Sequence, residues 1–333
     1  KKIFFTGATG FFGIWLLESF LRACNNLDLN SEALVLSRNP EKFLQQQPHL
    51  AACRRIKFHK GDVRNFEFPL GEYTHILHGA TTSATETFEK QDPLVKFDTV
   101  AVGTKHVLDF AVHSGCEKFL FISSASAYGK QPNNILQINE SYNGAPLTID
   151  KNFDHSVLGE AKRVSELLTI IYSDKYNFET KIARCYSFVG PYIPLNIHYV
   201  IGNVIRDAIN GGPIRLSGDG TTERSYLYIS DLSTWLWTIL FKGKDCEIYN
   251  VGSEVNINTK KLAEIVAESF KNEIEIIVEK SPGKIKNIDR YIPSTKKARD
   301  SLGLQETINL STAIEKTLCH ITANESLYNL NSR

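Results

Sequence analysis

Short apolar runs alternate with segments of helical periodicity in the first third of the chain, and this alternation constrains the fold more than any other feature. Strands joined by helices lie parallel in one sheet, since a right-handed crossover returns the chain to the same edge. Helices then cover both faces of the sheet. The predicted strands are residues 3–7, 32–38, 56–63, 74–80 and 118–124, and the predicted helices include residues 12–24 and 92–115.

The alternation continues with a predicted helix at 156–176 and a predicted strand at 180–190, and it loosens after that. The later elements expected are a glycine-rich loop and hairpin (211–220), two helices (232–243 and 259–270) and a short strand (273–279). We therefore predict an α/β protein with a Rossmann-type doubly wound parallel sheet in residues 1–185. Residues 186–330 are expected to form a smaller α/β substrate lobe at the carboxyl ends of the strands, with some segments returning to the sheet.

A glycine-rich turn, TGATGFFG at residues 6–13, stands at the first junction of strand and helix. Gly7 permits a tight turn, Gly10 removes a side chain where a pyrophosphate approaches, and Gly13 lets helix and strand pack closely. The helix N-terminus offers free N–H groups to the phosphates. A plain turn is the alternative, but the position of the motif favours a dinucleotide site. Further contacts are predicted for Thr9, Phe11, Phe12, Ser37, Arg38, Asp62, Val63, Gly79, Ala80 and Thr81.

The choice of dinucleotide depends on the end of the second predicted strand. NAD-binding proteins commonly place an acidic residue there, where it bonds the ribose hydroxyls. This sequence has Ser37 and Arg38 instead. Arg38 could accept the 2′-phosphate of NADP, or it could be a solvated cation that stacks on adenine. NAD is our expected cofactor, and NADP stays open.

Composition excludes several classes of function. With a formal net charge of +1, the chain has no global field to attract nucleic acid or an anionic membrane. The six cysteines form no CxxC pair and the nine histidines no HExxH pattern, so we expect reduced thiols and no metal site. No apolar run has the length of a membrane span, and the opening KKIFFTG leaves no room for a signal peptide. We therefore expect a cytoplasmic protein.

Several motifs occur in a fixed order, namely TGATGFFG, GDV, FISSASAYG, GEAKRVSE, ARCYSFVGP, RSYLYISDL and YNVGS. Together they resemble the extended short-chain dehydrogenase/reductases, and within these the NAD-dependent sugar-nucleotide epimerase/dehydratase family. The resemblance runs from residue 3 to about residue 315. It implies a cofactor-binding sheet domain and a C-terminal lobe that holds a nucleoside-diphosphate sugar.

The resemblance also implies a mechanism. In this family a tyrosinate takes a proton from a sugar hydroxyl while hydride moves to the nicotinamide, and the reduced cofactor later returns the hydride. A lysine four residues after the tyrosine holds the nicotinamide ribose and lowers the pKa of the tyrosine. A serine or threonine at the end of the fifth strand bonds the same substrate oxygen. Here the serine position falls on Ser124 and the lysine position on Lys162.

The tyrosine position of the motif falls on Leu158, which can neither accept nor donate a proton. Three interpretations follow. The enzyme is active and another group transfers the proton, with Tyr128 and Glu160 nearest in sequence. Alternatively, the protein binds cofactor and nucleotide sugar but turns over slowly or not at all. The third interpretation is an altered form of an active enzyme. SVLGEAKRVSE is similar to the NxMGxTKR pattern of some nucleotide-sugar dehydratases, which carry methionine at this position.

The residues after Ser124 depart from the family as well. The 4,6-dehydratases of the family place an Asp-Glu pair there, whereas this chain has Ala125 and Ser126. Neither side chain can serve as a general acid or base. This argues against a standard 4,6-dehydratase and leaves an epimerase, a decarboxylase or a divergent dehydratase.

Candidate substrate contacts follow from the same resemblance. Arg224 matches the family arginine that contacts the diphosphate, and Arg290 is a second candidate, because guanidinium groups suit phosphate oxygens. Both could instead be surface arginines. Ser187 replaces the family's usual asparagine beside the ligand. Asn203 could contact the same ligand or simply lie on a helix surface.

The leading hypothesis is an NAD(P)-dependent enzyme that modifies a nucleoside-diphosphate sugar for a surface glycan or a secondary metabolite. The alternatives are a catalytically weakened binding protein, suggested by Leu158, and a carbonyl reductase acting on a small ketone or ester. Residues 98–111 and 162–172 resemble the two helices through which the family often forms a four-helix dimer interface. We therefore expect a homodimer.

Overall fold

The chain divides into two compact units. The computed structural model describes residues 1–82, 86, 92–148, 153–197, 199–270, 272–281 and 288–328. The first unit comprises Lys1–Gly129, Ala145–Cys185 and Ser233–Tyr249. The second comprises Lys130–Gly144, Tyr186–Leu232 and Asn250–Arg333. Each unit is thus assembled from segments that are distant in the sequence.

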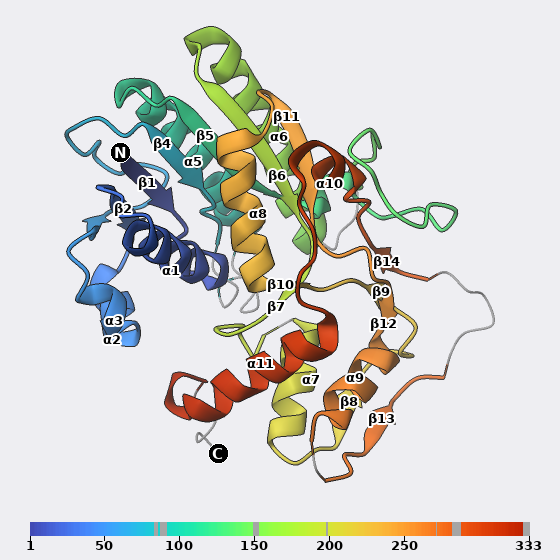
Figure 1. Ribbon diagram of the computed structural model, residues 1–333. Coiled ribbons are helices and arrows are strands. Elements are labelled where there is room, and N and C mark those ends of the chain that lie inside the picture. Colours follow the sequence, from blue (N-terminus) through green and yellow to red (C-terminus); the bar gives the residue numbers. More distant parts are fainter. Residues whose placement is uncertain are drawn as a thin grey trace. The chain divides into compact units, whose positions relative to one another are not determined.

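A seven-stranded sheet of order β11-β6-β5-β4-β1-β2-β3 forms the centre of the first unit (Figure 1). Its strands are β1 (Lys2–Thr6), β2 (Glu32–Ser37), β3 (Ile56–Lys60), β4 (His75–His78), β5 (Lys118–Ser124), β6 (Glu179–Cys185) and β11 (Glu247–Val251). Every pairing from β6 to β3 is parallel. The predicted α/β class with a doubly wound parallel sheet is therefore confirmed.

Helices cover both faces of this sheet. They are α1 (Phe11–Asn26), α2 (Pro40–Gln46), α3 (Pro48–Ala51), α5 (Pro93–His113), α6 (Phe153–Tyr176) and α8 (Ile229–Lys242). Successive residues of a strand point to opposite faces. Phe4 accordingly packs on Phe110 of α5, whereas Phe5 packs on Phe20 of α1 and Trp237 of α8. Helices α5 and α6 thus lie on one face, and α1 and α8 on the other (Figure 1).

The predicted strand at 180–190 is wrong in one respect, because it is two strands. β6 pairs with β5 as far as Cys185 opposite Ser124, where β5 ends. Beyond that point β5 offers no further partner. The chain then forms β7 (Phe188–Val189), which pairs with β10 (Leu227–Tyr228) in the second unit.

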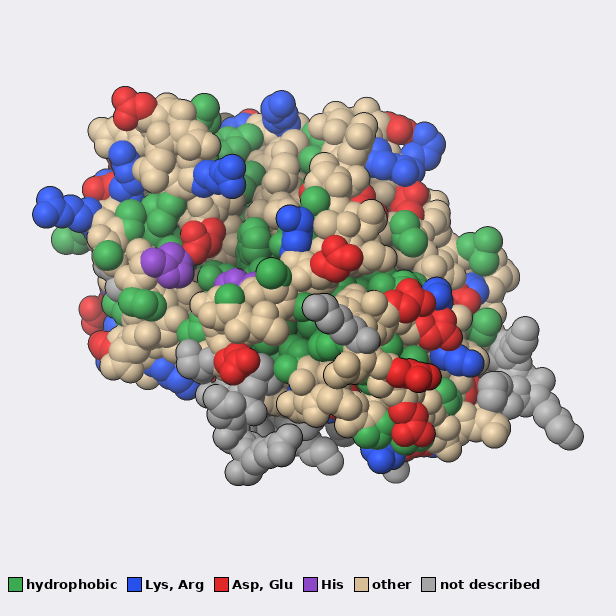
Figure 2. Space-filling model, turned by 60° about the horizontal axis from the view of Figure 1, so that its bottom comes forward, with side chains coloured by type: hydrophobic (Ala, Val, Ile, Leu, Met, Phe, Trp, Pro, Cys, Tyr) green, Lys and Arg blue, Asp and Glu red, His purple; other side chains and the backbone are tan. Residues whose placement is uncertain are grey.

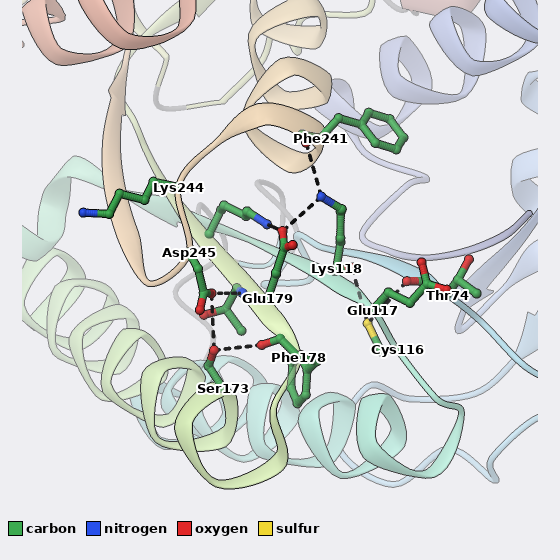
Figure 3. Close-up of polar contacts among 12 residues, drawn as sticks. Thr74, Cys116, Glu117, Lys118, Ser173, Phe178, Glu179, Phe241, Lys244 and Asp245 are labelled. Atoms are coloured by element: carbon green, nitrogen blue, oxygen red, sulfur yellow. Dashed lines mark hydrogen bonds and ion pairs between the residues drawn. The ribbon is translucent and has the colours of Figure 1, made fainter.

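Polar contacts join the amino ends of β5 and β6 to the last turn of α8 and to the loop after it (Figure 3). Lys118 donates to Glu179 at 3.0 Å and to the Phe241 carbonyl at 3.3 Å. The fully buried Lys181 also pairs with Glu179. Asp245 accepts the Thr180 N–H at 2.7 Å. This edge is opposite the carboxyl ends of the strands, where ligands bind in such sheets, so its role is structural.

The second unit contains short strands, four α-helices and one 3-10 helix among its described residues. They are β7, α7 (Val200–Ile209), β8 (Ile214–Leu216), β9 (Glu223–Arg224), β10, β12 (Ile257–Asn258), α9 (Thr259–Glu268), β13 (Ile276–Val278), β14 (Arg290–Tyr291), α10 (Lys296–Leu302), α11 (Leu310–Ala323) and the 3-10 helix η2 (Glu325–Tyr328). The Asn250 side chain, from YNVGS, donates to the carbonyls of Ile138 and Ser294. It thereby joins three distant segments of this unit.

The exposed surface carries charges of both signs. Figure 2 shows lysine and arginine side chains interspersed with aspartate and glutamate across the face that it presents. This distribution agrees with the small net charge of +1. Among the described residues, none of the helices combines the length and apolarity needed to cross a membrane.

Candidate functional site

The turn after β1 requires glycine at Gly7 and Gly13 for different reasons. Gly7 has φ +75°, and a Cβ there would lie 2.6 Å from the backbone of Gly79. At Gly13 a Cβ would lie 2.1 Å from the Cα of Ala8, so helix α1 can approach the turn only without a side chain. Both positions therefore depend on close backbone packing between the turn, α1 and the end of β4.

Gly10 stands where the same turn is open to a ligand. The nearest atom to an added Cβ would be the Gly7 carbonyl oxygen, at an ordinary 3.5 Å. Gly10 is also the residue before the first turn of α1, and it provides no side-chain cap for that turn. An open backbone at a helix N-terminus fits a pyrophosphate, and the residues present thus fit a dinucleotide.

A buried polar chain fixes the end of β4 beside this turn. The Gly79 N–H donates to the Thr6 carbonyl, and the Ala80 N–H to Thr6 Oγ1. Thr6 Oγ1 lies 2.6 Å from His78 Nδ1, and His78 Nε2 lies 2.8 Å from Thr104 Oγ1. Burial lowers the pKa of His78 to about 3, so this imidazole is neutral at pH 7. His78 was not among the predicted site residues, since only its place before Gly79 marks it in the sequence.

Two ion pairs stand at the ends of β2 and β3. Arg38 follows β2 and contacts both carboxylate oxygens of Glu86, at 2.7 and 3.1 Å. Asp62 follows β3 and accepts from the backbone N–H, Nε and Nη2 of Arg64, each at 2.9 Å. The bonds from Arg64 hold the pKa of Asp62 below its usual value. Ser37 Oγ accepts the Asn39 N–H, which turns the chain away from β2.

Ser124 ends β5 and is held by the 3-10 turn that follows, η1 (Ala125–Tyr128). Its Oγ accepts from the Ser126 N–H at 3.2 Å and from Ser126 Oγ at 2.7 Å. Two accepted bonds use both lone pairs of the Ser124 hydroxyl. The Ser124 hydrogen is therefore left to be donated to another group.

Lys162 lies on α6, buried against the end of β5. Its Nζ donates to the Ile122 carbonyl at 2.7 Å and lies 4.6 Å from the centre of the Phe121 ring. Burial lowers the pKa of Lys162 to about 8. The structure thus brings the Lys162 amine to Ile122, two residues before Ser124 on β5.

Leu158 lies one helical turn before Lys162 and is half-buried. The next residue, Gly159, packs α6 directly on η1, since a Cβ there would lie 2.5 Å from the Ser126 carbonyl oxygen. The turn of α6 that carries Leu158 therefore lies against the segment that carries Ser124 and Ser126. No other residue type fits at 159 without moving this contact.

The two groups considered as substitutes for a tyrosine are both engaged elsewhere. Tyr128 is buried, and the Arg184 guanidinium lies 4.2 Å from the centre of its ring. Glu160 pairs with Arg163 at 3.8 Å. Because residues two apart on a helix lie on nearly opposite sides, the side chain of Glu160 leaves α6 away from Lys162. The geometry favours neither residue as the proton-transfer group.

A buried ion pair joins the elements that carry the candidate residues. Glu166, one turn after Lys162 on α6, accepts two bonds from Arg184 of β6, at 2.9 and 2.5 Å. Ser123 of β5 donates to the same carboxylate at 2.5 Å. The pair of Glu166 and Arg184 was not predicted, because its members lie 18 residues apart on different elements.

Replacing Glu166 by alanine is expected to lower the free energy of unfolding by about 3–5 kcal/mol, because Arg184 would remain buried without its partner. Urea unfolding followed by circular dichroism measures this loss. The matched control is Glu117→Ala, which removes an exposed carboxylate paired with Lys1 and should cost less than about 1 kcal/mol. Equal losses in the two variants would contradict the structural role of the buried pair.

In the second unit, the two candidate arginines lie on neighbouring strands with their side chains on opposite faces. Glu223 and Arg224 of β9 pair in register with Arg290 and Tyr291 of β14. Arg290 is 9% exposed and bonds Glu223 at 2.6 Å. Arg224 bonds Asp289 at 2.6 Å and lies over the Tyr291 ring. The interpretation of Arg290 as a surface arginine is wrong, because Glu223 and the carbonyls of the loop at 133–135 hold it inside this unit.

Ser187 and Asn203 also belong to the second unit. Ser187 separates β6 from β7, and its carbonyl accepts the Leu227 N–H at 3.1 Å. Asn203 lies on α7, where its side-chain oxygen accepts from Arg206 at 3.2 Å. Both side chains are partly exposed. The candidate residues thus form two groups, one around β1, β4, β5 and α6 in the first unit and one around β9 and α7 in the second.

Known proteins provide an independent comparison. The family profile "NAD dependent epimerase/dehydratase family" matches residues 3–252. UDP-glucuronic acid decarboxylase 6 of Arabidopsis thaliana is 26% identical over 312 residues, which cover 93% of this chain and 85% of that protein. UDP-glucuronic acid decarboxylase 3 of the same plant is 27% identical over 317 residues, with coverage of 93% and 85%.

Solved structures agree in fold. A dTDP-glucose 4,6-dehydratase from Streptomyces venezuelae, determined with NAD bound, superposes with a TM-score of 0.81 at 21% identity, covering 99% of each chain. The fold of the whole chain, including both units, is therefore shared with such proteins.

Proposed function

Because the chain belongs to the NAD dependent epimerase/dehydratase family, we propose that it modifies a nucleoside-diphosphate sugar by transient hydride transfer. The bound nicotinamide cofactor would accept a hydride from a sugar carbon and later return it. The reactions open to this site are epimerisation, decarboxylation and a divergent dehydration. Decarboxylation gains support from the UDP-glucuronic acid decarboxylases among the relatives, which align with 93% of the chain.

The observation that carries this proposal is the placement of Lys162 beside the end of β5. Lys162 is buried, and its amine donates to the carbonyl of Ile122, two residues before Ser124 on β5. A cation there would hold the cofactor ribose. The Ser124 hydroxyl, whose lone pairs are occupied by Ser126, would donate its hydrogen to the reacting sugar oxygen. On the second unit, Arg224 is the candidate contact for the diphosphate, with Asp289 to be displaced or shared.

A second candidate function is that of a weakly active or inactive binding protein, and Leu158 favours it. The alkyl side chain at this position transfers no proton, and the two nearby candidates are engaged by Arg184 and Arg163. Such a protein would bind cofactor and nucleotide sugar without turning the sugar over.

Proton NMR on panels of UDP- and dTDP-sugars, incubated with the protein and NAD, separates these functions. The proposed enzyme would convert at least one sugar, with the cofactor returned to its starting state. Survival of every sugar with the cofactor still bound would support the binding protein. Failure to bind UDP or dTDP at all would contradict both, and would favour a carbonyl reductase.

We further propose a homodimer that forms through α5 and α6. Val164, Leu167 and Ile171 project from α6 at helical spacing and are exposed, Leu167 to 62%. Exposed apolar stripes of this kind mark protein interfaces. On the neighbouring α5, Leu94 and Val102 are exposed as well.

Light scattering at micromolar concentration tests the dimer, with twice the chain mass expected for the unaltered protein. Leu167→Glu is expected to shift the mass to that of the monomer, since a charge would be buried at the interface. Leu70→Glu is the control, because Leu70 is 92% exposed and belongs to the segment between β3 and β4 rather than to α5 or α6. A monomeric unaltered protein would overturn the proposal.

A further inference from the structure

The end of β2 lacks the acidic residue that NAD-binding sheets commonly carry, yet the fold delivers a carboxylate to that place. Ser37 ends β2 and Arg38 follows it. Glu86, 48 residues later in the chain, holds both outer nitrogens of Arg38 with its two oxygens, at 2.7 and 3.1 Å. A sequence motif centred on β2 shows an arginine there, whereas the folded protein presents an arginine-carboxylate pair.

At the end of the neighbouring strand, β3, a carboxylate is likewise paired with an arginine. Asp62 after β3 is held by Arg64 through two side-chain bonds of 2.9 Å. The two pairs interact, since Asp62 adds to the electrostatic stabilisation of protonated Arg38 and Glu86 to that of Arg64. The group therefore holds two guanidinium and two carboxylate groups, which sum to no net charge.

We propose that Glu86 is the residue that selects NAD over NADP, by occupying Arg38 and by supplying the negative charge that β2 itself lacks. This inference rests on the proposed function, because it assumes that the glycine turn holds a nicotinamide dinucleotide. It concerns a different part of the site, namely the end of β2. This strand end faces the 2′ position of the adenosine ribose, where NADP carries a phosphate and NAD a hydroxyl.

The physical argument is a competition for one guanidinium. The 2′-phosphate of NADP carries between one and two negative charges near neutral pH and seeks a guanidinium fork. To reach Arg38 it must displace Glu86, and the displaced carboxylate then repels it at short range. NAD presents a neutral hydroxyl at the same position, which needs no such displacement. Selectivity of this kind comes from a penalty on the wrong ligand rather than from a new contact to the right one.

The test is the affinity of the protein for each dinucleotide, measured by isothermal titration calorimetry without any sugar. The unaltered protein is expected to bind NAD more tightly than NADP. Glu86→Gln keeps the shape of the side chain and removes its charge, so NADP should bind at least about tenfold more tightly, while NAD changes by less than about threefold. Adding Arg38→Ala to this variant should abolish the gain for NADP.

Glu32→Gln is the matched control. Glu32 begins β2 and pairs with Lys57 of β3 at 3.0 Å, so this variant loses one exposed ion pair and one charge at the opposite end of the same strands. It should leave the ratio of the two affinities unchanged. Thermal melting of all variants confirms that each is folded.

The outcomes separate this proposal from the function it rests on. If the unaltered protein binds neither dinucleotide, the proposed function fails and the role of Glu86 fails with it. If NAD binds but Glu86→Gln leaves the ratio of NADP to NAD affinity unchanged, only the role of Glu86 is overturned. A preference of the unaltered protein for NADP would also overturn it.

Discussion

Replacing Leu158 by tyrosine is expected to raise the rate at which a bound nucleotide sugar reduces NAD by about a hundredfold, the usual contribution of a positioned general base. Residue 158 lies one turn before Lys162, on the part of α6 that Gly159 packs against the Ser124 segment. A phenol there would have a cation beside it to lower its pKa and a hydroxyl donor across from it. Stopped-flow absorbance at the wavelength of the reduced nicotinamide measures the rate.

Val157→Tyr is the matched control for this prediction. It adds the same phenol one residue earlier on α6, which turns it by about 100° around the helix axis. Its rate should equal that of the unaltered protein. If Leu158→Tyr also has no effect, either another residue already transfers the proton or position 158 does not face the reacting carbon.

Replacing Gly7 by alanine is expected to weaken NAD binding at least about a hundredfold, or about 2.7 kcal/mol of binding free energy. The substitution combines a backbone at φ +75° with a Cβ only 2.6 Å from the Gly79 backbone. The atoms nearest to this Cβ belong to the backbone of Gly79 and Ala80, so the turn must open. The hydrogen bonds that Thr6 Oγ1 makes with His78 and with the Ala80 N–H must then shift as well. Fluorescence titration with NAD measures the affinity, and thermal melting measures the accompanying loss of stability.

Gly115→Ala separates conformational strain from the loss of the turn. Gly115 follows α5 at φ +67°, and an added Cβ would meet none of the atoms in the described part of the chain within 4 Å. This variant should lose about 1 kcal/mol of stability and keep its affinity for NAD. Equal losses of affinity in the two variants would contradict the role of the turn.

Much of the first unit could be predicted because its information is local. Each signal is contained in a short stretch of sequence. These signals are the apolar runs of β1 to β5, the helical periodicity of α1 and α5, and the glycines of the first turn. Parallel pairing and helix placement then follow from the handedness of the crossovers. The split of β6 from β7 was missed, since it depends on where the neighbouring strand β5 ends.

The candidate site was less predictable, because its residues act in pairs that the sequence does not display. Arg38 suggested a site for the 2′-phosphate of NADP. Its partner Glu86, 48 residues away in the chain, neutralises the charge of Arg38 and occupies its guanidinium group. Arg224 and Arg290 were both candidate contacts for the diphosphate, with Arg224 as the match to the family arginine. The register of β9 and β14 sends them to opposite faces, with Arg290 buried on Glu223.

The sequence by itself determined the sheet, the glycine turn and the spacing of Leu158, Lys162 and Glu166, because periodicity and steric demands act over neighbouring residues. Only the tertiary structure decided which charges remain available to a ligand. An ion pair forms between groups that the fold brings within a few ångströms, whatever their separation along the chain, and its Coulomb energy depends on that distance and on how deeply the fold buries the pair.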